Sequence, residues 1–188
     1  TTPMGQYHFD TVAPGTYRIV QYTPSGLLDG QSHAGTIQSV RNGISVDGSM
    51  IRQITMTPGG IGVDYNFCEI SPASVSGYVY HDQSNDGRRD GGENGIGGAT
   101  VTLVDSNGQV VATAQTDSDG YYQFDDLVPG TYELREQQPA GFLDGTDTVG
   151  RIGGSRVGIA GNDVIRQIAL PQGMSGAEYN FGELMPAS

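Results

Sequence analysis

The chain has 188 residues and a formal net charge of −12, with 30 glycines and ten tyrosines. This negative charge argues against nucleic acid and anionic membrane surfaces as partners, and no apolar run is long enough to insert into a membrane. The single cysteine, Cys68, excludes an internal disulfide, and all nine basic residues are arginine.

The chain contains one series of segments twice. Four segments of its first part recur in the same order in the second: 5–10 (GQYHFD) as 120–125 (GYYQFD), 14–17 (PGTY) as 129–132, 51–54 (IRQI) as 165–168 and 65–67 (YNF) as 179–181. A period of this length is typical of whole domains in tandem. We therefore expect a complete unit at 75–188. At 1–74 we expect the C-terminal part of another unit, which lacks the equivalents of 75–115.

In the complete unit, residues 75–81 alternate in polarity and are rich in valine and tyrosine, which predicts a first strand. An acidic, glycine-rich loop follows at 82–98. Further strands are expected at 99–104, 109–116, 121–124 and 131–136, and, after an irregular segment at 137–162, at 163–170 and 177–183. Short strands with a turn every ten residues or so predict an all-β, antiparallel sandwich.

The connection between the two units is short and contains Pro72. A linker of a few residues with a proline is semi-rigid. We therefore expect neighbouring repeats of the same protein to be partners in a stalk-like array. The missing front strands of 1–74 also leave open a strand-swapped or strand-complemented oligomer.

The loop after the first predicted strand has oxygen donors at the spacing of an EF-hand calcium loop. Counting from position 1, the predicted ligands are Asp82, Ser84, Asp86, Arg88 through its backbone carbonyl, Asp90 and Glu93. Gly87 at position 6 permits the sharp turn, and a hard cation such as Ca²⁺ needs about six to eight oxygens. The loop therefore predicts Ca²⁺ as a cofactor; the alternative is a solvated acidic turn.

The calcium loop departs from the EF-hand in two ways, since position 8 is Arg89 and no helices flank it. This predicts a calcium loop inserted between strands. Asp117 and Asp119, in the turn before Gly120, are a possible second metal site or ordinary turn formers. Asp144 and Asp147 are weaker candidates.

Two long motifs carry a resemblance to known domains. Residues 78–103 (YVYHDQSNDGRRDGGENGIGGATVTL) resemble the opening of an SdrD-type B domain. Residues 116–136, from Thr-Asp-x-x-Gly to Tyr-x-Leu-x-Glu, resemble the middle of a collagen-adhesin B-type (Cna-B-like) domain. The resemblance implies tandem immunoglobulin-like, prealbumin-like β-sandwiches with Greek-key topology. It also implies an extracellular or bacterial cell-surface location, calcium that rigidifies the module, and a spacer role.

Many Cna-B-like domains form an isopeptide bond between a lysine and an Asn or Asp, assisted by a carboxylate. Glu136 stands where that assisting glutamate would be, and Gln21 replaces it in the first copy. Because the chain has no lysine, no isopeptide bond is expected. Glu136 is then interpreted as a strand-end residue.

The leading hypothesis is a non-enzymatic, calcium-stabilised spacer of a cell-surface or secreted adhesin-like protein. The alternative is a module that binds a polysaccharide or protein ligand through tyrosine rings, namely Tyr7, Tyr22, Tyr78, Tyr80, Tyr121 and Tyr122. Tyrosines that alternate along strands also pack in the core or on the sheet. An enzyme is not expected, since His8, His33 and His81 accompany no plausible nucleophile.

Overall fold

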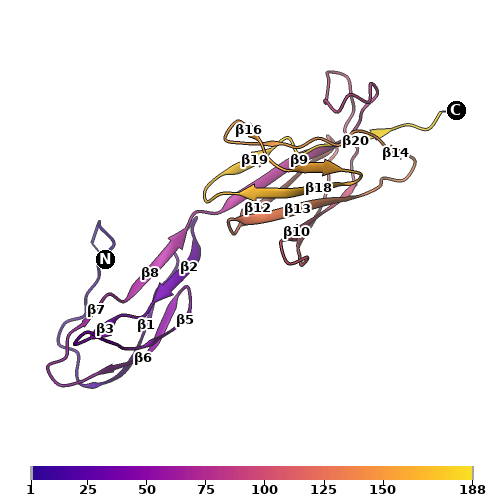
Figure 1. Ribbon diagram of the computed structural model, residues 1–188. Coiled ribbons are helices and arrows are strands. Elements are labelled where there is room, and N and C mark those ends of the chain that lie inside the picture. The colour runs from indigo at the N-terminus through magenta and orange to yellow at the C-terminus, as the bar shows by residue number, and fades with distance from the viewer. Residues whose placement is uncertain (1, 188) are drawn as a thin grey trace. The chain divides into compact units, whose positions relative to one another are not determined.

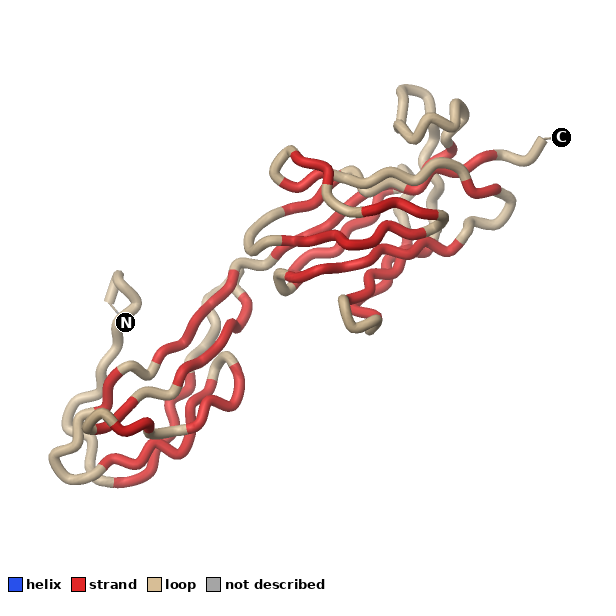
Figure 2. The backbone as a smooth tube through the Cα atoms, viewed as in Figure 1, coloured by secondary structure: helices blue, strands red, loops and turns tan. Residues whose placement is uncertain are grey.

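The computed structural model describes residues 2–187, which form strands joined by turns and loops (Figures 1 and 2). No helix of the described part is long and apolar enough to cross a membrane. The chain divides into two compact units, the first ending at Ile70 and the second beginning at Ser71. The outermost residues of the two predicted domains, Thr1 and Ser188, lie outside the described residues.

The first unit is built around a small apolar core. Its strands are β1 (Gly15–Val20), β2 (Leu28–His33), β3 (Thr36–Ile37), β4 (Val40–Arg41), β5 (Ile44–Asp47), β6 (Met50–Met56), β7 (Gly62–Val63) and β8 (Asn66–Ile70). Strand β6 lies between β1 and β5, β3 lies between β4 and β7, and β2 pairs with β8. The buried side chains are Ala34, Ile37, Ile51, Ile54 and Tyr65.

The second unit is a sandwich of two sheets. Its strands are β9 (Ala73–His81), β10 (Thr100–Asp105), β11 (Val110–Gln115), β12 (Tyr121–Leu127), β13 (Gly130–Gln137), β14 (Leu143–Asp144), β15 (Arg151–Ile152), β16 (Ser155–Arg156), β17 (Ile159–Gly161), β18 (Val164–Leu170), β19 (Ser175–Ala177) and β20 (Phe181–Leu184). One sheet has the order β11–β10–β13–β18–β17. In the other, β9 pairs with β12, β19 and β20, while β14 pairs with β20 and β15 with β19.

The core of the second unit follows from the alternation of its strands. Successive residues of a strand point to opposite faces, so every second side chain enters the space between the sheets. Val75 and Val79 of β9, Val101 and Leu103 of β10 and Leu134 of β13 have essentially no exposed surface. Burial of such apolar side chains is the main source of stability. The predicted all-β, immunoglobulin-like sandwich is confirmed.

Two details differ from the sequence-based expectation. The segment 137–162 is not wholly irregular, because it contains the four short strands β14 to β17. The strand expected at 177–183 is interrupted, and both β19 and β20 run parallel to β9, so the sandwich is not purely antiparallel. Glu178 has a φ of 63°, which breaks the strand there. The Asn180 side chain accepts the Tyr78 N–H at 3.0 Å.

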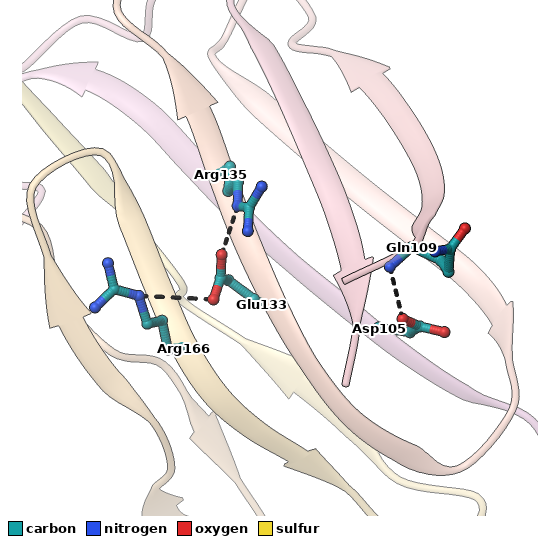
Figure 3. Close-up of polar contacts among 5 residues, drawn as sticks. All are labelled: Asp105, Gln109, Glu133, Arg135 and Arg166. Carbon is teal, nitrogen blue, oxygen red and sulfur yellow. Dashed lines mark hydrogen bonds and ion pairs between the residues drawn. The ribbon is translucent and has the colours of Figure 1, made fainter. Parts of the chain in front are cut away.

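The outer face of β13 carries the ion pairs of this sheet (Figure 3). Glu133 pairs with Arg135 of the same strand, and with Arg166 of β18 at 3.6 Å. At the β10–β11 turn, Asp105 accepts the Gln109 N–H at 2.9 Å, and this bond lowers the pKa of Asp105. These charges lie outside the core, where such pairs contribute little to stability.

One buried hydrogen bond links β12 to the segment between β19 and β20. The Tyr122 side chain is 2% exposed, and its hydroxyl donates to the Tyr179 carbonyl at 2.7 Å. We expect Tyr122→Phe to lower the free energy of unfolding by about 1–3 kcal/mol, since it leaves a buried carbonyl unpaired. Urea unfolding measures the loss. Tyr121→Phe, whose hydroxyl contacts only the exposed Gln123 side chain, is the control. Equal losses in both variants would contradict the prediction.

Candidate cation-binding sites

The acidic loop (residues 82–93) begins at the end of β9, and its first residue is fully buried. Asp82 is 0% exposed, and its N–H donates to the Glu183 carbonyl of β20 at 2.9 Å. Its carboxylate accepts the N–H groups of Gly87 at 2.8 Å and Asp86 at 3.3 Å. Gly87 has a φ of 72°, the left-handed conformation that the predicted turn at position 6 requires. Asp82 therefore organises the loop from inside.

The last residue of the acidic loop closes it. The two carboxylate oxygens of Glu93 accept the N–H of Gln83 at 2.9 Å and of Asp90 at 2.8 Å. The Ser84 hydroxyl donates to Asp82 at 3.3 Å, and Asp86 accepts the Arg88 N–H at 2.9 Å. Both ends of the predicted ligand series thus face the loop's own backbone, while the side chains of its middle residues are exposed.

The donor set of the acidic loop suits a hard cation, because every predicted ligand atom is an oxygen. Within the described residues, however, the loop carboxylates do not form a group of three with oxygens inside 4.8 Å of one another. They accept backbone N–H groups instead. Calcium binding would require the loop carboxylates to come closer together than they are in this structure. The primary site therefore stays a prediction.

Tyr80, which the sequence suggested only as one of the ligand-binding rings of the alternative hypothesis, lies beside the acidic loop. Its side chain is fully buried, and its hydroxyl has no hydrogen-bond partner within the described structure. Burial raises the pKa of Tyr80, and the carboxylates of Asp82, Glu93 and Asp86 raise it further. The negative charge of the loop therefore acts on the buried hydroxyl group of Tyr80.

Arg89, the departure from the EF-hand pattern, anchors the loop to the sheet. Its guanidinium lies 4.1 Å from the centre of the Tyr78 ring and donates to the Asp119 carbonyl at 3.1 Å. Such a cation–π contact stabilises by about 0.5–1 kcal/mol at an exposed site. It also occupies one face of the Tyr78 ring, which the alternative hypothesis assigns to a ligand.

The possible second site, Asp117 and Asp119, lies in an exposed turn beside the acidic loop. The Asp117 carboxylate accepts the N–H groups of Asp119 and Tyr121, both at 2.9 Å. These are the bonds by which aspartate stabilises a turn. The geometry supports the turn-forming role of Asp117, and a metal role for the pair stays a prediction.

A carboxyl cluster (Glu136, Asp163 and Glu183) lies elsewhere in the second unit. Each residue offers an oxygen, and these oxygens lie within 4.8 Å of one another. Glu136 is near the end of β13, Asp163 is in the turn before β18, and Glu183 is in β20. The Glu136 N–H donates to the Asp163 carbonyl at 2.9 Å, which holds these two residues side by side.

Burial gives the carboxyl cluster unusual electrostatics. Glu136 is 7% exposed and Glu183 is 0% exposed. Burial, followed by the charge of Glu183, raises the pKa of Glu136 to about 10. Burial and the charge of Asp144 raise the pKa of Asp147 to about 8, and burial also raises that of Glu183. Buried carboxylates that repel one another retain their protons unless a positive charge is supplied.

The sequence analysis did not predict the carboxyl cluster as a site. Glu136 is the penultimate residue of β13, close to the predicted strand end, but its side chain points inward. Asp144, a weaker candidate, pairs with Glu183 across β14 and β20, and Asp147 accepts the Gly182 N–H at 3.3 Å. The available signal was the alternation of β13, which places Glu136 on the same face as Leu134. Asp163 and Glu183 had no signal in sequence spacing.

Comparison with known proteins covers most of the chain. Residues 73–182 match the model of the SdrD B-like domain. Serine-aspartate repeat-containing protein C of Staphylococcus aureus strain N315 is 35% identical over 150 residues, which is 79% of this chain and 15% of that protein. The chain therefore spans a small part of its curated relatives.

Solved structures show more distant similarity. GBS52, the minor pilin of Streptococcus agalactiae, is 12% identical with a TM-score of 0.42, over 77% of this chain and 59% of that one. The Bacillus anthracis TIE protein is 13% identical with a TM-score of 0.40, over 92% of this chain and 25% of that one. The extent of the domain match and the identity to the staphylococcal protein show that this chain belongs to the SdrD B-like domain family.

Proposed function

We propose that this chain is a non-enzymatic structural module of a bacterial cell-surface protein, stabilised by Ca²⁺ and acting as a spacer beside neighbouring repeats. Membership of the SdrD B-like family and the tandem sequence repeat support the structural role. The observation that supports the calcium role is the acidic loop, whose sequence has oxygen donors at calcium-loop spacing and whose chain turns at a left-handed Gly87 beside a fully buried Asp82.

A stabilising cation suits this site for an electrostatic reason. The chain has a net charge of −12, and the loop places four carboxylates within twelve residues. Because like charges repel, the carboxylates destabilise the metal-free loop, although its backbone N–H groups bond to Asp82 and Glu93. A cation that binds only the folded loop raises the stability of the unit by mass action. The acidic loop follows β9, which lies in the middle of its sheet. A cation bound to the loop is therefore expected to stabilise the folded unit as a whole.

The tyrosines favour the spacer over a polysaccharide-binding module. Tyr80 and Tyr122 are buried, and Arg89 covers a face of Tyr78. Tyr121 packs against Tyr78 with ring centres 5.3 Å apart. These side chains serve the sheet and its core, so few of the six rings are open to stack on a sugar.

Thermal unfolding with and without calcium tests the calcium role. Extracellular calcium modules bind at about 0.1–1 mM, and a ligand at about 100 times its Kd stabilises by about 2.7 kcal/mol. We expect Ca²⁺ to raise the Tm of the chelator-treated chain by several degrees. Asp86→Ala should reduce this rise, because it removes a loop ligand.

Asp125→Ala, which removes an exposed carboxylate outside the acidic loop, is the matched control and should keep the full rise. The proposal is wrong if calcium leaves the Tm of the unmodified chain unchanged. It is also wrong if Asp86→Ala responds to calcium as strongly as Asp125→Ala does.

A further inference from the structure

We propose that Glu136, Asp163 and Glu183 form a second cation site in this unit, specific for a hard divalent cation such as Ca²⁺ and separate from the acidic loop. The proposal does not depend on calcium binding by the loop. It rests on the spacing of the three carboxyl groups, on their burial without a partner, and on a comparison of the two units.

The spacing suits one ion shared by three residues. Calcium binds oxygen at about 2.3–2.6 Å, so two ligands of the same ion lie at most about 5 Å apart. One carboxylate oxygen from each of the three residues lies within 4.8 Å of the other two. The set contains no histidine or cysteine, which disfavours zinc and other softer metals.

The second observation is that the cluster is buried and unpartnered. Glu136 is 7% exposed, and no N–H or hydroxyl group of the described structure bonds to either of its carboxylate oxygens. The group that faces it is the carboxyl of Glu183. The Gln138 amide donates to one oxygen of Glu183, and the other oxygen has no partner there. An ionised carboxylate buried without a partner is costly, and folded proteins compensate it by pairing or by a metal ion.

Arginine does not provide this compensation. In the part of the chain that the structure describes, no ion pair reaches the carboxyl cluster. Arg135 of β13 and Arg166 of β18 belong to the strands that carry or adjoin it, but both pair with Glu133 on the outer face (Figure 3). Without such a pair, these carboxyls either retain protons or ionise around a cation taken up from solution.

Two more carboxylates increase the negative potential at the cluster. Asp144 and Asp147 approach it from β14 and from the turn after β14, and one oxygen of each is buried without a partner. The raised pKa values of Glu136 and Asp147 reflect the same crowding. A divalent cation would relieve this repulsion, and the surrounding strands already hold the ligands in place.

The first unit serves as an internal comparison. Its Gln21 N–H donates to the Ser49 carbonyl at 2.9 Å, as the Glu136 N–H does to Asp163. Its Asp29 pairs with Glu69 across β2 and β8, as Asp144 does with Glu183. The backbone arrangement around the cluster thus recurs in the first unit. There, Gln21 replaces Glu136 and Ser49 replaces Asp163. The site is therefore specific to the second unit, and the replacements Glu136→Gln and Asp163→Ser are compatible with this fold.

A titration with Tb³⁺, a hard cation whose luminescence nearby tyrosines sensitise, tests the site on the full chain. Asp86→Ala is used as the background in order to weaken the loop. We expect this variant to retain one tyrosine-sensitised Tb³⁺ that Ca²⁺ displaces. Adding Glu136→Gln and Asp163→Ser should weaken this binding at least tenfold, whereas adding Glu133→Gln, on the outer face of β13, should leave it unchanged. Circular dichroism verifies that each variant is folded.

The proposal is overturned if the Asp86→Ala variant binds no Tb³⁺, or if the Glu136→Gln and Asp163→Ser replacements leave its affinity unchanged. The test separates the two proposals. If Asp86→Ala leaves the number of bound ions unchanged while Glu136→Gln and Asp163→Ser reduce it, the cluster is supported and the loop is not.

Discussion

In buffer with a chelator, raising the pH from about 5 to about 9 is expected to lower the free energy of unfolding of the second unit by a few kcal/mol. The source is Glu136, whose pKa is raised from 4.5 to about 10 by burial and by the facing groups Glu183, Asp163 and Asp147. A group that is protonated in the folded state and ionised in the unfolded state changes the free energy of unfolding by up to about 1.4 kcal/mol per pH unit.

The sign of this dependence follows from the direction of the shift. Between pH 4.5 and about 10 the folded protein holds a proton on Glu136 that the unfolded chain has released. The stabilisation is therefore complete below pH 4.5 and is lost as the pH rises toward 10. Asp147, with its pKa raised to about 8, adds a smaller loss of the same sign. Urea unfolding at a series of pH values measures the slope, and hydrogen exchange assigns the transition to the second unit.

Glu136→Gln is expected to flatten most of this slope and to stabilise the unit at high pH, because the amide stays neutral. Glu133→Gln is the matched control on the outer face of the same strand. Its carboxylate pairs with Arg135 and Arg166 at the surface, so its loss should cost under about 1 kcal/mol and leave the slope intact. A slope that Glu136→Gln leaves unchanged would show that this carboxyl does not control the pH response.

Gly77→Ala is expected to destabilise the second unit by about 4 kcal/mol or more, and to prevent its folding if the unit is only marginally stable. A Cβ at Gly77 would lie 1.6 Å from the Tyr179 carbonyl oxygen and 2.9 Å from the Tyr122 hydroxyl. The first contact is with backbone, which cannot rotate away. Relief would require β9 to move from the segment after β19, breaking the 3.2 Å bond between the Tyr179 N–H and the Ser76 carbonyl.

The matched control for this substitution is Gly91→Ala, in the acidic loop. A Cβ there meets no atom within 4 Å, so we expect a change below about 0.5 kcal/mol. Thermal and urea unfolding compare the two variants. If Gly77→Ala costs no more than Gly91→Ala, the close packing of β9 against Tyr179 does not limit the stability of the unit.

The sequence by itself determined the features that depend on neighbouring residues. The repeat can be read directly from the sequence, and the alternating strands of the sandwich follow from local patterns, because strand periodicity acts over a few residues. The spacing of the acidic loop and its glycine at position 6 were also visible, and Gly87 has the required positive φ.

Only the tertiary structure decided which distant residues meet. Glu136, Asp163 and Glu183 come from three separate parts of the chain, and their meeting depends on how β13, β18 and β20 lie in two sheets. The parallel pairing of β19 and β20 with β9 could not be read from alternation, which is the same for both strand directions. The physical reason is that pairing register and sheet order are set by the packing of the whole core. This packing buries Glu136, which the sequence suggested as a strand-end residue, beside two other carboxyl groups.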